Sequence, residues 1–170
     1  RREFVLLQEC AADDVSAAVN YARESGLPIA VRGGSHSVPG FGTGDDAVVI
    51  DLVRMQSVVV DPSKRRARAE GGTTWGAFND ATHAHGLATT GGIISTTGVG
   101  GLTLGGGIGY LTRGVGLSCD NLVSAEVVTA DGSKLAASED ENEDLFWAIR
   151  GGGGNFGVVT SFEFRLHPVR

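Results

Sequence analysis

One stretch of this sequence concentrates glycine, and it constrains the fold more than any other feature. The chain carries 27 glycines among 170 residues, about twice the usual share, and many of them lie between residues 91 and 116. A flexible linker would be polar, but apolar side chains interrupt these glycines: Ile93, Ile94, Val99, Leu102, Leu104, Ile108 and Leu111. This pattern indicates backbone that is buried and packs closely against something flat or anionic.

The pattern before residue 55 predicts a small parallel sheet. Apolar residues at helical spacing predict a helix that begins at Asp13 or Asp14 and ends at Gly26. Short apolar runs predict strands at 4–8, 29–32 and 47–51. A strand, a helix and a strand in this order are typical of a βαβ unit.

Beyond residue 55 the pattern changes to hairpins, with turns at Pro62-Ser63 and Asp131-Gly132. The other expected elements are a helix from Thr73 or Thr74 to about His85, a helix around 142–150 and a closing strand at 157–166, with Trp75 and Trp147 in the core. The sequence therefore predicts an α+β fold in two lobes, at about 1–55 and 56–170. A small parallel sheet in the first lobe accompanies a larger mixed or antiparallel sheet in the second, with flanking helices.

Composition argues against several classes of partner. The net charge of −6 disfavours nucleic-acid binding, which needs a basic face. No apolar run is long enough to cross a bilayer, and no signal-peptide pattern opens the chain, so we expect no membrane partner and favour a cytoplasmic location. The two cysteines, Cys10 and Cys119, predict neither a disulfide framework nor a zinc site; each is expected to be a small buried residue.

Several familiar motifs fit poorly. The glycines at 105–109 follow no convincing strand, as a Rossmann fingerprint requires, and no Gly-Lys-Ser/Thr sequence of a Walker loop is present. His83 and His85 lie two apart on a predicted helix and would face different directions, so we expect no metal site.

The best candidate for a ligand-binding loop follows the strand at 29–32. It reads Arg32-Gly33-Gly34-Ser35-His36-Ser37. Glycine backbone lets amides approach a phosphate, and the serine hydroxyls add donors. From these residues alone, an ordinary turn is an equally good interpretation.

Five motifs together resemble a known family. They are Arg32-Gly33-Gly34-Ser35-His36, VVIDLVRM at 48–55, the glycine pair at 71–72, TTGVGGLTLGGGIGYLTRGVGLSCDNL at 96–122, and RGGGGNFGVVTSFEF at 150–164. In this order they resemble the FAD-binding (PCMH-type) domain of the vanillyl-alcohol oxidase superfamily. Within it they are most similar to berberine-bridge-enzyme-like oxidases, especially bacterial 6-hydroxynicotine-oxidase-like proteins.

The resemblance implies roles for particular residues toward FAD. Residues Arg32, Gly33, Gly34, Ser35, His36 and Ser37 would wrap the pyrophosphate. His36 would also bond covalently to a methyl group on the benzenoid ring of the flavin. Residues Ser95, Thr96, Thr97, Gly98 and Gly101 would line the ribityl chain and the flavin, and Gly157 and Val159 would meet its pyrimidine edge. Doubly linked relatives carry Cys at Ile94 and His at Leu102, so we expect one covalent link.

The implied activity is that of a flavin oxidase with a small-molecule substrate. Hydride would leave a carbon that bears oxygen or nitrogen, and molecular oxygen would accept the electrons. The family's substrate domain, which usually carries the catalytic base, has no match here, so no catalytic residue is assigned and the oligomeric state is left open. A dehydrogenase, an aldonolactone-type oxidase or a non-catalytic flavin-holding domain are the alternatives.

Overall fold

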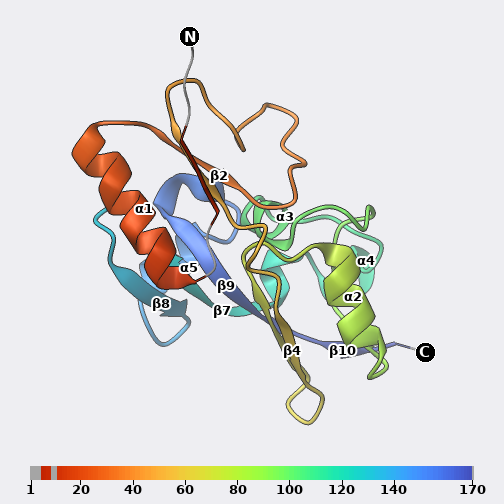
Figure 1. Ribbon diagram of the computed structural model, residues 1–170. Helices are drawn as coiled ribbons and strands as arrows, with labels where there is room; N and C mark the ends of the chain where they lie inside the picture. Colours follow the sequence, from red (N-terminus) through yellow and green to blue (C-terminus); the bar gives the residue numbers. More distant parts are fainter. Residues whose placement is uncertain (1–4, 9–10, 170) are drawn as a thin grey trace.

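The computed structural model describes residues 5–8 and 11–169 and shows an α+β protein with a small parallel sheet beside a larger antiparallel sheet (Figure 1). The predicted fold class is therefore confirmed. Among the described residues, no helix has the length and apolar character needed to cross a membrane.

The small sheet forms as a βαβ unit, as the sequence predicted. Its strands run parallel in the order β1-β3-β2, with bounds β1 Val5–Gln8, β2 Ile29–Arg32 and β3 Val48–Asp51. Helix α1 (Ala12–Ser25) buries its apolar face and ends at Gly26, whose φ of 68° suits a left-handed cap. The expected N-cap was wrong: Ala11 occupies it, and Asp14 accepts a hydrogen bond from the Ala11 amide.

The large sheet is antiparallel throughout, in the order β4-β5-β9-β7-β8. Its strands are β4 Val58–Asp61, β5 Arg66–Glu70, β7 Leu122–Val128, β8 Lys134–Ser138 and β9 Val158–Arg165. Both predicted hairpins are present, and the β4–β5 hairpin projects from the lower end of the molecule in Figure 1. A separate two-stranded antiparallel pair joins β6 (Leu87–Ala88) to β10 (His167–Pro168), the short strand that follows β9 in the chain.

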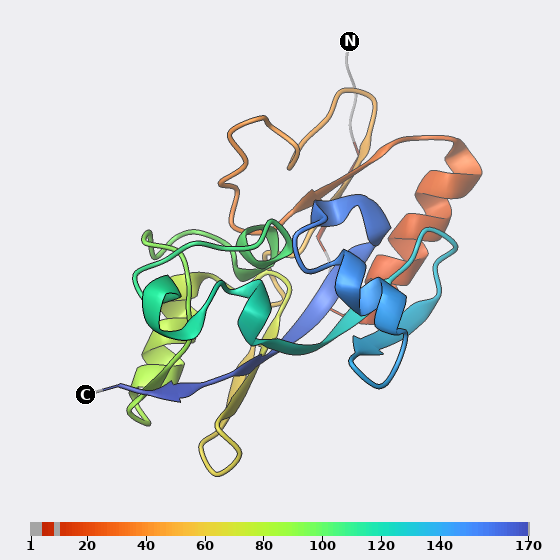
Figure 2. The same cartoon turned by 180° about the vertical axis from the view of Figure 1, so that it is seen from behind.

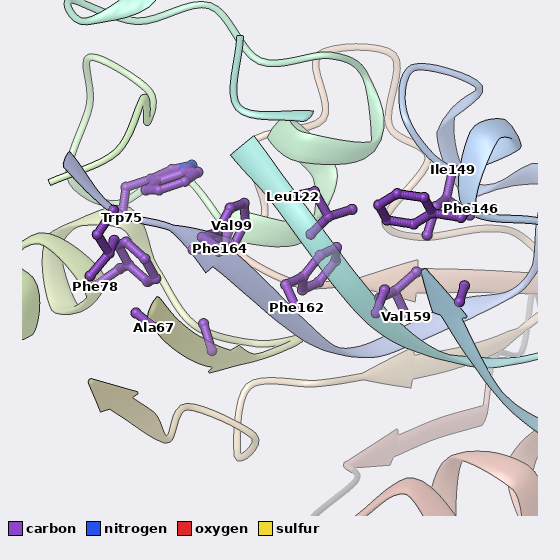
Figure 3. Close-up of a cluster of buried hydrophobic side chains, with 14 of the residues drawn as sticks. Ala67, Trp75, Phe78, Val99, Leu122, Phe146, Ile149, Val159, Phe162 and Phe164 are labelled. Atoms are coloured by element: carbon purple, nitrogen blue, oxygen red, sulfur yellow. The ribbon is translucent and has the colours of Figure 1, made fainter. Parts of the chain in front are cut away.

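An aromatic cluster on the large sheet forms the main core (Figure 3). Phe164 contacts Trp75, Phe78 and Phe162, with ring centroids 5.4 to 6.1 Å apart. All four side chains are fully buried. Trp147, by contrast, is 75% exposed, so its expected place in the core was wrong.

A second core cluster joins α1 to the small sheet and takes Val128 and Val158 from the large one. The two lobes therefore share packing across the boundary expected near residue 55, and their division into separate units stays a prediction. Cys119 is buried, as expected; Cys10 lies outside the described residues.

Helices flank the large sheet (Figure 2), and two of the short ones lie in the glycine-rich stretch at 91–116. Their bounds are α2 Trp75–His83, α3 Val99–Leu104, α4 Thr112–Val115, α5 Glu143–Ala148, and the 3-10 turns η1 Cys119–Asn121 and η2 Gly153–Phe156. The helix expected from Thr73 or Thr74 begins after Thr74.

Backbone contact and buried polar side chains hold the glycine-rich stretch together. A Cβ at Gly109 would lie 1.7 Å from the carbonyl oxygen of Gly91, so only glycine fits there. The buried Ser118 hydroxyl donates to the Thr90 carbonyl at 2.8 Å. Asn121 donates from Nδ2 to two carbonyls of the preceding loop, each at 2.8 Å. The backbone of the stretch is thus closely packed at these points, whereas the side chains of Ile93, Ile94 and Ile108 are more than half exposed.

The aromatic cluster gives a direct test of the core. We expect Phe162→Ala to lower the free energy of unfolding by about 3–5 kcal/mol, because it opens a cavity beneath the central strand β9. Val59 is 63% exposed on β4, so Val59→Ala should cost less than about 1 kcal/mol. Denaturant titration of both variants makes the comparison, and equal losses would contradict this account of the core.

Candidate functional site

The two loops predicted to bind the cofactor meet at their glycines. A Cβ at Gly34 would lie 2.1 Å from the amide nitrogen of Gly98, and a Cβ at Gly98 would lie 2.5 Å from that of Gly34. Real Cβ atoms do not approach backbone so closely, so both positions require glycine. The structure therefore brings together two segments that lie more than sixty residues apart in the sequence.

The second loop is anchored to the start of α2. The amides of Trp75 and Gly76 donate to the carbonyls of Thr97 and Ser95, at 2.9 and 2.8 Å. The first amides of a helix have no partner within the helix, and here the loop supplies the carbonyls. In return, Val99 donates its amide to the carbonyl of Thr73 at 2.8 Å. The loop at 95–98 is thus a fixed part of the large lobe.

Gly71 lies where the two loops and the large sheet converge, and the sequence did not single it out as a site residue. Its amide donates to the Thr160 carbonyl at 2.9 Å. Its own carbonyl oxygen lies within 3.5 Å of the Cβ positions of Gly33 and Gly100. The glycine pair at 71–72 could have revealed this role, because a paired glycine directly after a strand is typical of a close backbone approach.

The first loop carries a row of amides without protein partners. Among residues 5–8 and 11–169, no carbonyl or side chain accepts a hydrogen bond from the amides of Gly33 through Ser37. Ser35 has a φ of 59°, and a left-handed residue of this kind is one component of an anion-binding nest. The Ser37 hydroxyl accepts the Phe41 amide at 3.0 Å and so closes the turn that follows.

His36 lies exposed at the end of this row of amides. Its Nε2 atom lies 2.8 Å from the Thr96 hydroxyl, in the opposite loop. One hydrogen bond thus connects the two segments beside the Gly34–Gly98 contact. The sequence placed both residues at the cofactor, but it did not predict that they touch.

Comparison with known proteins now identifies the cofactor. Residues 9–138 match a family model described as an FAD binding domain. The chain belongs to this family. The predicted family membership and the predicted cofactor, FAD, are confirmed.

The matched relatives include several oxidases, which are considerably longer than this chain. (R)-6-hydroxynicotine oxidase of Paenarthrobacter nicotinovorans is 43% identical over 165 residues, which are 96% of this chain and 36% of that protein. The crystal structure of 6-hydroxy-D-nicotine oxidase from Arthrobacter nicotinovorans superposes with a TM-score of 0.94 at 42% identity, covering 96% and 36% of the two chains. Glucooligosaccharide oxidase from Acremonium strictum superposes at 0.90 and 37% identity, covering 97% and 36%. The chain thus spans little more than a third of these relatives.

The residues present fit FAD. Bare amides on the loop at 33–37 suit the negatively charged pyrophosphate. A flat ring system needs backbone that no side chain covers. At Gly101 there is open space of this kind, because no atom lies within 4 Å of its Cβ position. Exposed apolar side chains stand beside it in the sequence, including Ile93 and Ile94 at 64% and 52% exposure. The FAD-binding domain therefore presents both a loop of unpartnered amides and exposed apolar side chains.

Arg32 has a different environment from the one its predicted role suggested. Its Nη2 atom donates to Asp51 Oδ2 at 2.6 Å, and the Asp51 side chain is fully buried. Gln8 donates to the same oxygen and the Val53 amide to the other. Burial alone would raise the pKa of Asp51, but these hydrogen bonds and the Arg32 charge together lower it. One edge of the guanidinium is thus committed to Asp51, the last residue of the neighbouring strand β3.

In the part of the chain that the structure describes, neither Gly157 nor Val159 forms a hydrogen bond with the two loops. The Val159 side chain is buried in the aromatic core cluster, and its carbonyl oxygen would lie 2.5 Å from a Cβ at Gly71. Gly157 has a φ of 139° and packs against the Val128 carbonyl. Their contact with the flavin stays a prediction.

A metal site and a separate ligand cavity are two other kinds of site that a chain of this size could carry. No group of three histidine, cysteine or acidic residues is placed to hold a metal ion in the part of the chain that the structure describes. A cavity of about 340 Å³ lies between α2 and the glycine-rich stretch, lined in part by Asn79, Thr82, Thr89 and Tyr110. None of the predicted FAD-binding residues lines it.

The glycine contact predicts a specific loss of FAD affinity. Gly34→Ala should weaken binding by about tenfold or more, equivalent to about 1.4 kcal/mol, because its Cβ must push the two loops apart. The titration is best done in a His36→Ala background, where binding is reversible. Gly114 in α4 has open space at its Cβ position, so Gly114→Ala is the matched control and should leave the dissociation constant unchanged. Equal affinities in both variants would refute the contact.

The buried Asp51 predicts a pH-dependent contribution to stability. Because its pKa is lowered on folding from 3.8, the contribution is present above pH 3.8 and is lost as the pH falls through the lower, folded value. We expect Asp51→Asn to lower the free energy of unfolding by about 1.5–3 kcal/mol at pH 7. Below pH 3.8 the wild-type and variant curves should converge. Parallel curves from pH 7 to pH 2.5 would show that Asp51 titrates alike in both states.

Proposed function

We propose that this chain is the FAD-holding part of an oxidase for a small-molecule substrate, and that His36 carries the flavin covalently. When bound, FAD supplies the two-electron oxidation of a carbon that bears oxygen or nitrogen, with molecular oxygen as electron acceptor. The relatives support this: two are nicotine oxidases, and the Acremonium strictum enzyme is described as carrying an 8α-N1-histidyl FAD.

The observation that carries the proposal is the position of His36. It is the one ring nucleophile on the loop of bare amides, it is exposed, and Thr96 holds its ring from the opposite loop. Amides of Gly33 through Ser37 bind the pyrophosphate and so fix the cofactor relative to the imidazole. Holding the two reacting groups in place converts their encounter into an intramolecular reaction, which favours bond formation strongly.

The apolar side chains near the loop at 95–98 point to a single covalent link. Where doubly linked relatives carry cysteine, this chain has Ile94, and an alkyl side chain forms no thioether. The glucooligosaccharide oxidase is described as carrying a 6-S-cysteinyl bond as well as the histidyl bond. His36 is therefore the only anchor proposed for this chain.

Acid precipitation tests the covalent link. A tethered flavin stays with the unfolded polypeptide, so we expect a yellow pellet from the complete natural polypeptide that contains this sequence. His36→Ala should still bind FAD through the amides but release it to the supernatant. His85 is exposed after α2, and His85→Ala should keep the yellow pellet.

The outcomes separate the parts of the proposal. A colourless wild-type pellet beneath a yellow supernatant would refute the covalent link and leave FAD binding intact. Peroxide production during turnover in air tests the oxidase assignment. Turnover with an artificial acceptor but none with oxygen would make the protein a dehydrogenase.

A further inference from the structure

The two ring nitrogens of His36 have different surroundings. Nε2 lies 2.8 Å from Thr96 Oγ1. Nδ1 has no hydrogen-bond partner among residues 5–8 and 11–169. The ring is therefore held at one nitrogen and open at the other.

The direction of the hydrogen bond at Nε2 sets which nitrogen of His36 is nucleophilic. Neutral imidazole carries one proton, and only the nitrogen without it has a lone pair to form a bond. If the Thr96 oxygen accepts the Nε2–H, the lone pair is on Nδ1. The same atom is the one that faces no protein partner.

We propose that Thr96 is a positioning residue for flavin attachment: its hydroxyl holds Nε2 of His36 and leaves Nδ1 as the atom that bonds to FAD. This role rests on the covalent link proposed above. Thr96 acts through His36 and does not itself bond to the flavin.

The reaction balances with molecular oxygen as the oxidant. An N–C bond forms between Nδ1 and the methyl carbon on the benzenoid ring of the flavin, while one C–H bond of that methyl and the Nε2–H bond break. These two hydrogens leave as protons, and two electrons are released. Molecular oxygen takes up both electrons and both protons and becomes hydrogen peroxide.

The Thr96 hydroxyl suits both ends of this reaction because it can donate and accept. Before the bond forms, its oxygen accepts the Nε2–H. Afterwards Nε2 has only a lone pair, and the hydroxyl donates to it. Thr96 is exposed, so the displaced proton has a path to water.

The backbone fixes Thr96 in this position. Its neighbours Ser95 and Thr97 bond through their carbonyls to the first amides of α2, and the Thr97 amide donates to the Ile94 carbonyl at 3.1 Å. The Thr96 carbonyl itself lies 2.9 Å from the Cβ position of Gly34. Replacing the hydroxyl by a methyl group should therefore leave the loop in place and remove only the hydrogen bond.

Thr96→Val and Thr96→Ser separate the hydroxyl from the shape of the side chain. FAD is added to apoprotein of the complete natural polypeptide, and acid-stable flavin is measured against time. At FAD concentrations that saturate the non-covalent complex of each protein, we expect Thr96→Val to form the covalent bond about 10- to 100-fold more slowly. Thr96→Ser should restore the rate. Thr43 is exposed in the loop after His36, and Thr43→Val is the matched control with an unchanged rate.

The bonded atom is identified in the flavin peptide released by proteolysis. A link through Nδ1 puts the flavin methylene protons close to the β-protons of His36, whereas a link through Nε2 puts them close to the ring Hδ2. Nuclear Overhauser contacts distinguish the two. We expect contacts to the β-protons in the wild type.

Three results would overturn the role of Thr96. The first is a Thr96→Val rate equal to that of wild type, and the second is a wild-type link through Nε2. The third is a wild-type apoprotein in which His36 carries its proton on Nδ1; ring ¹⁵N chemical shifts report this, and the His36→Gln variant assigns the signals. The last two use only the wild type, so they decide even if Thr96→Val fails to fold. A wild type that never binds flavin covalently would instead refute the link itself, and the role of Thr96 with it.

Discussion

The close approach of Gly34 to Gly98 is the constraint on which the site depends. It brings the end of the small parallel sheet against a loop that is fixed to α2 and the large sheet. Side chains at either position would force the two loops apart, so the distance between the loops is set by bare backbone. The amides of the first loop and the hydroxyl of Thr96 then lie on opposite sides of the same contact, close enough for His36 to bridge them.

An ion pair, Arg32 with Asp51, lies at the end of the small sheet from which the first loop leaves. The buried Asp51 needs a partner, since an unpaired carboxylate would be costly to remove from water. Arg32, which directly precedes Gly33 and Gly34, and the Val53 amide both donate hydrogen bonds to it. The pair thus ties the last residue of β2 to β3 and fixes the direction in which the loop leaves the sheet. The positive charge of Arg32 remains near the amides, where it favours an anion, although one edge of its guanidinium is already bonded.

Much of this arrangement could be predicted from the sequence, and the reason is local. The βαβ unit follows from apolar runs and a helix with Gly26 as its stop, and both hairpins follow from Pro62-Ser63 and Asp131-Gly132. The backbone of the glycine-rich stretch packs closely at Gly109, but several of the apolar residues that predicted its burial, such as Ile93 and Ile108, are exposed. The N-cap of α1 was misassigned because Asp14 bonds backward to Ala11 rather than capping directly. Trp147 was misplaced because residue type alone does not tell which face of a short helix meets the sheet. The His36–Thr96 bond and the convergence at Gly71 are long-range contacts, and no local pattern carries them.

The site is built from backbone to an unusual degree, and this limits what the FAD-binding domain itself can decide. Amides and glycine Cα atoms recognise features that every FAD molecule shares, namely a pyrophosphate and a flat ring. They carry no information about the molecule to be oxidised. The same domain can therefore occur in relatives described as nicotine oxidases and as an oligosaccharide oxidase. In the function proposed here, the side chains of His36 and Thr96 would act on the cofactor. Selection of the substrate would then come from groups that approach the flavin from outside this domain.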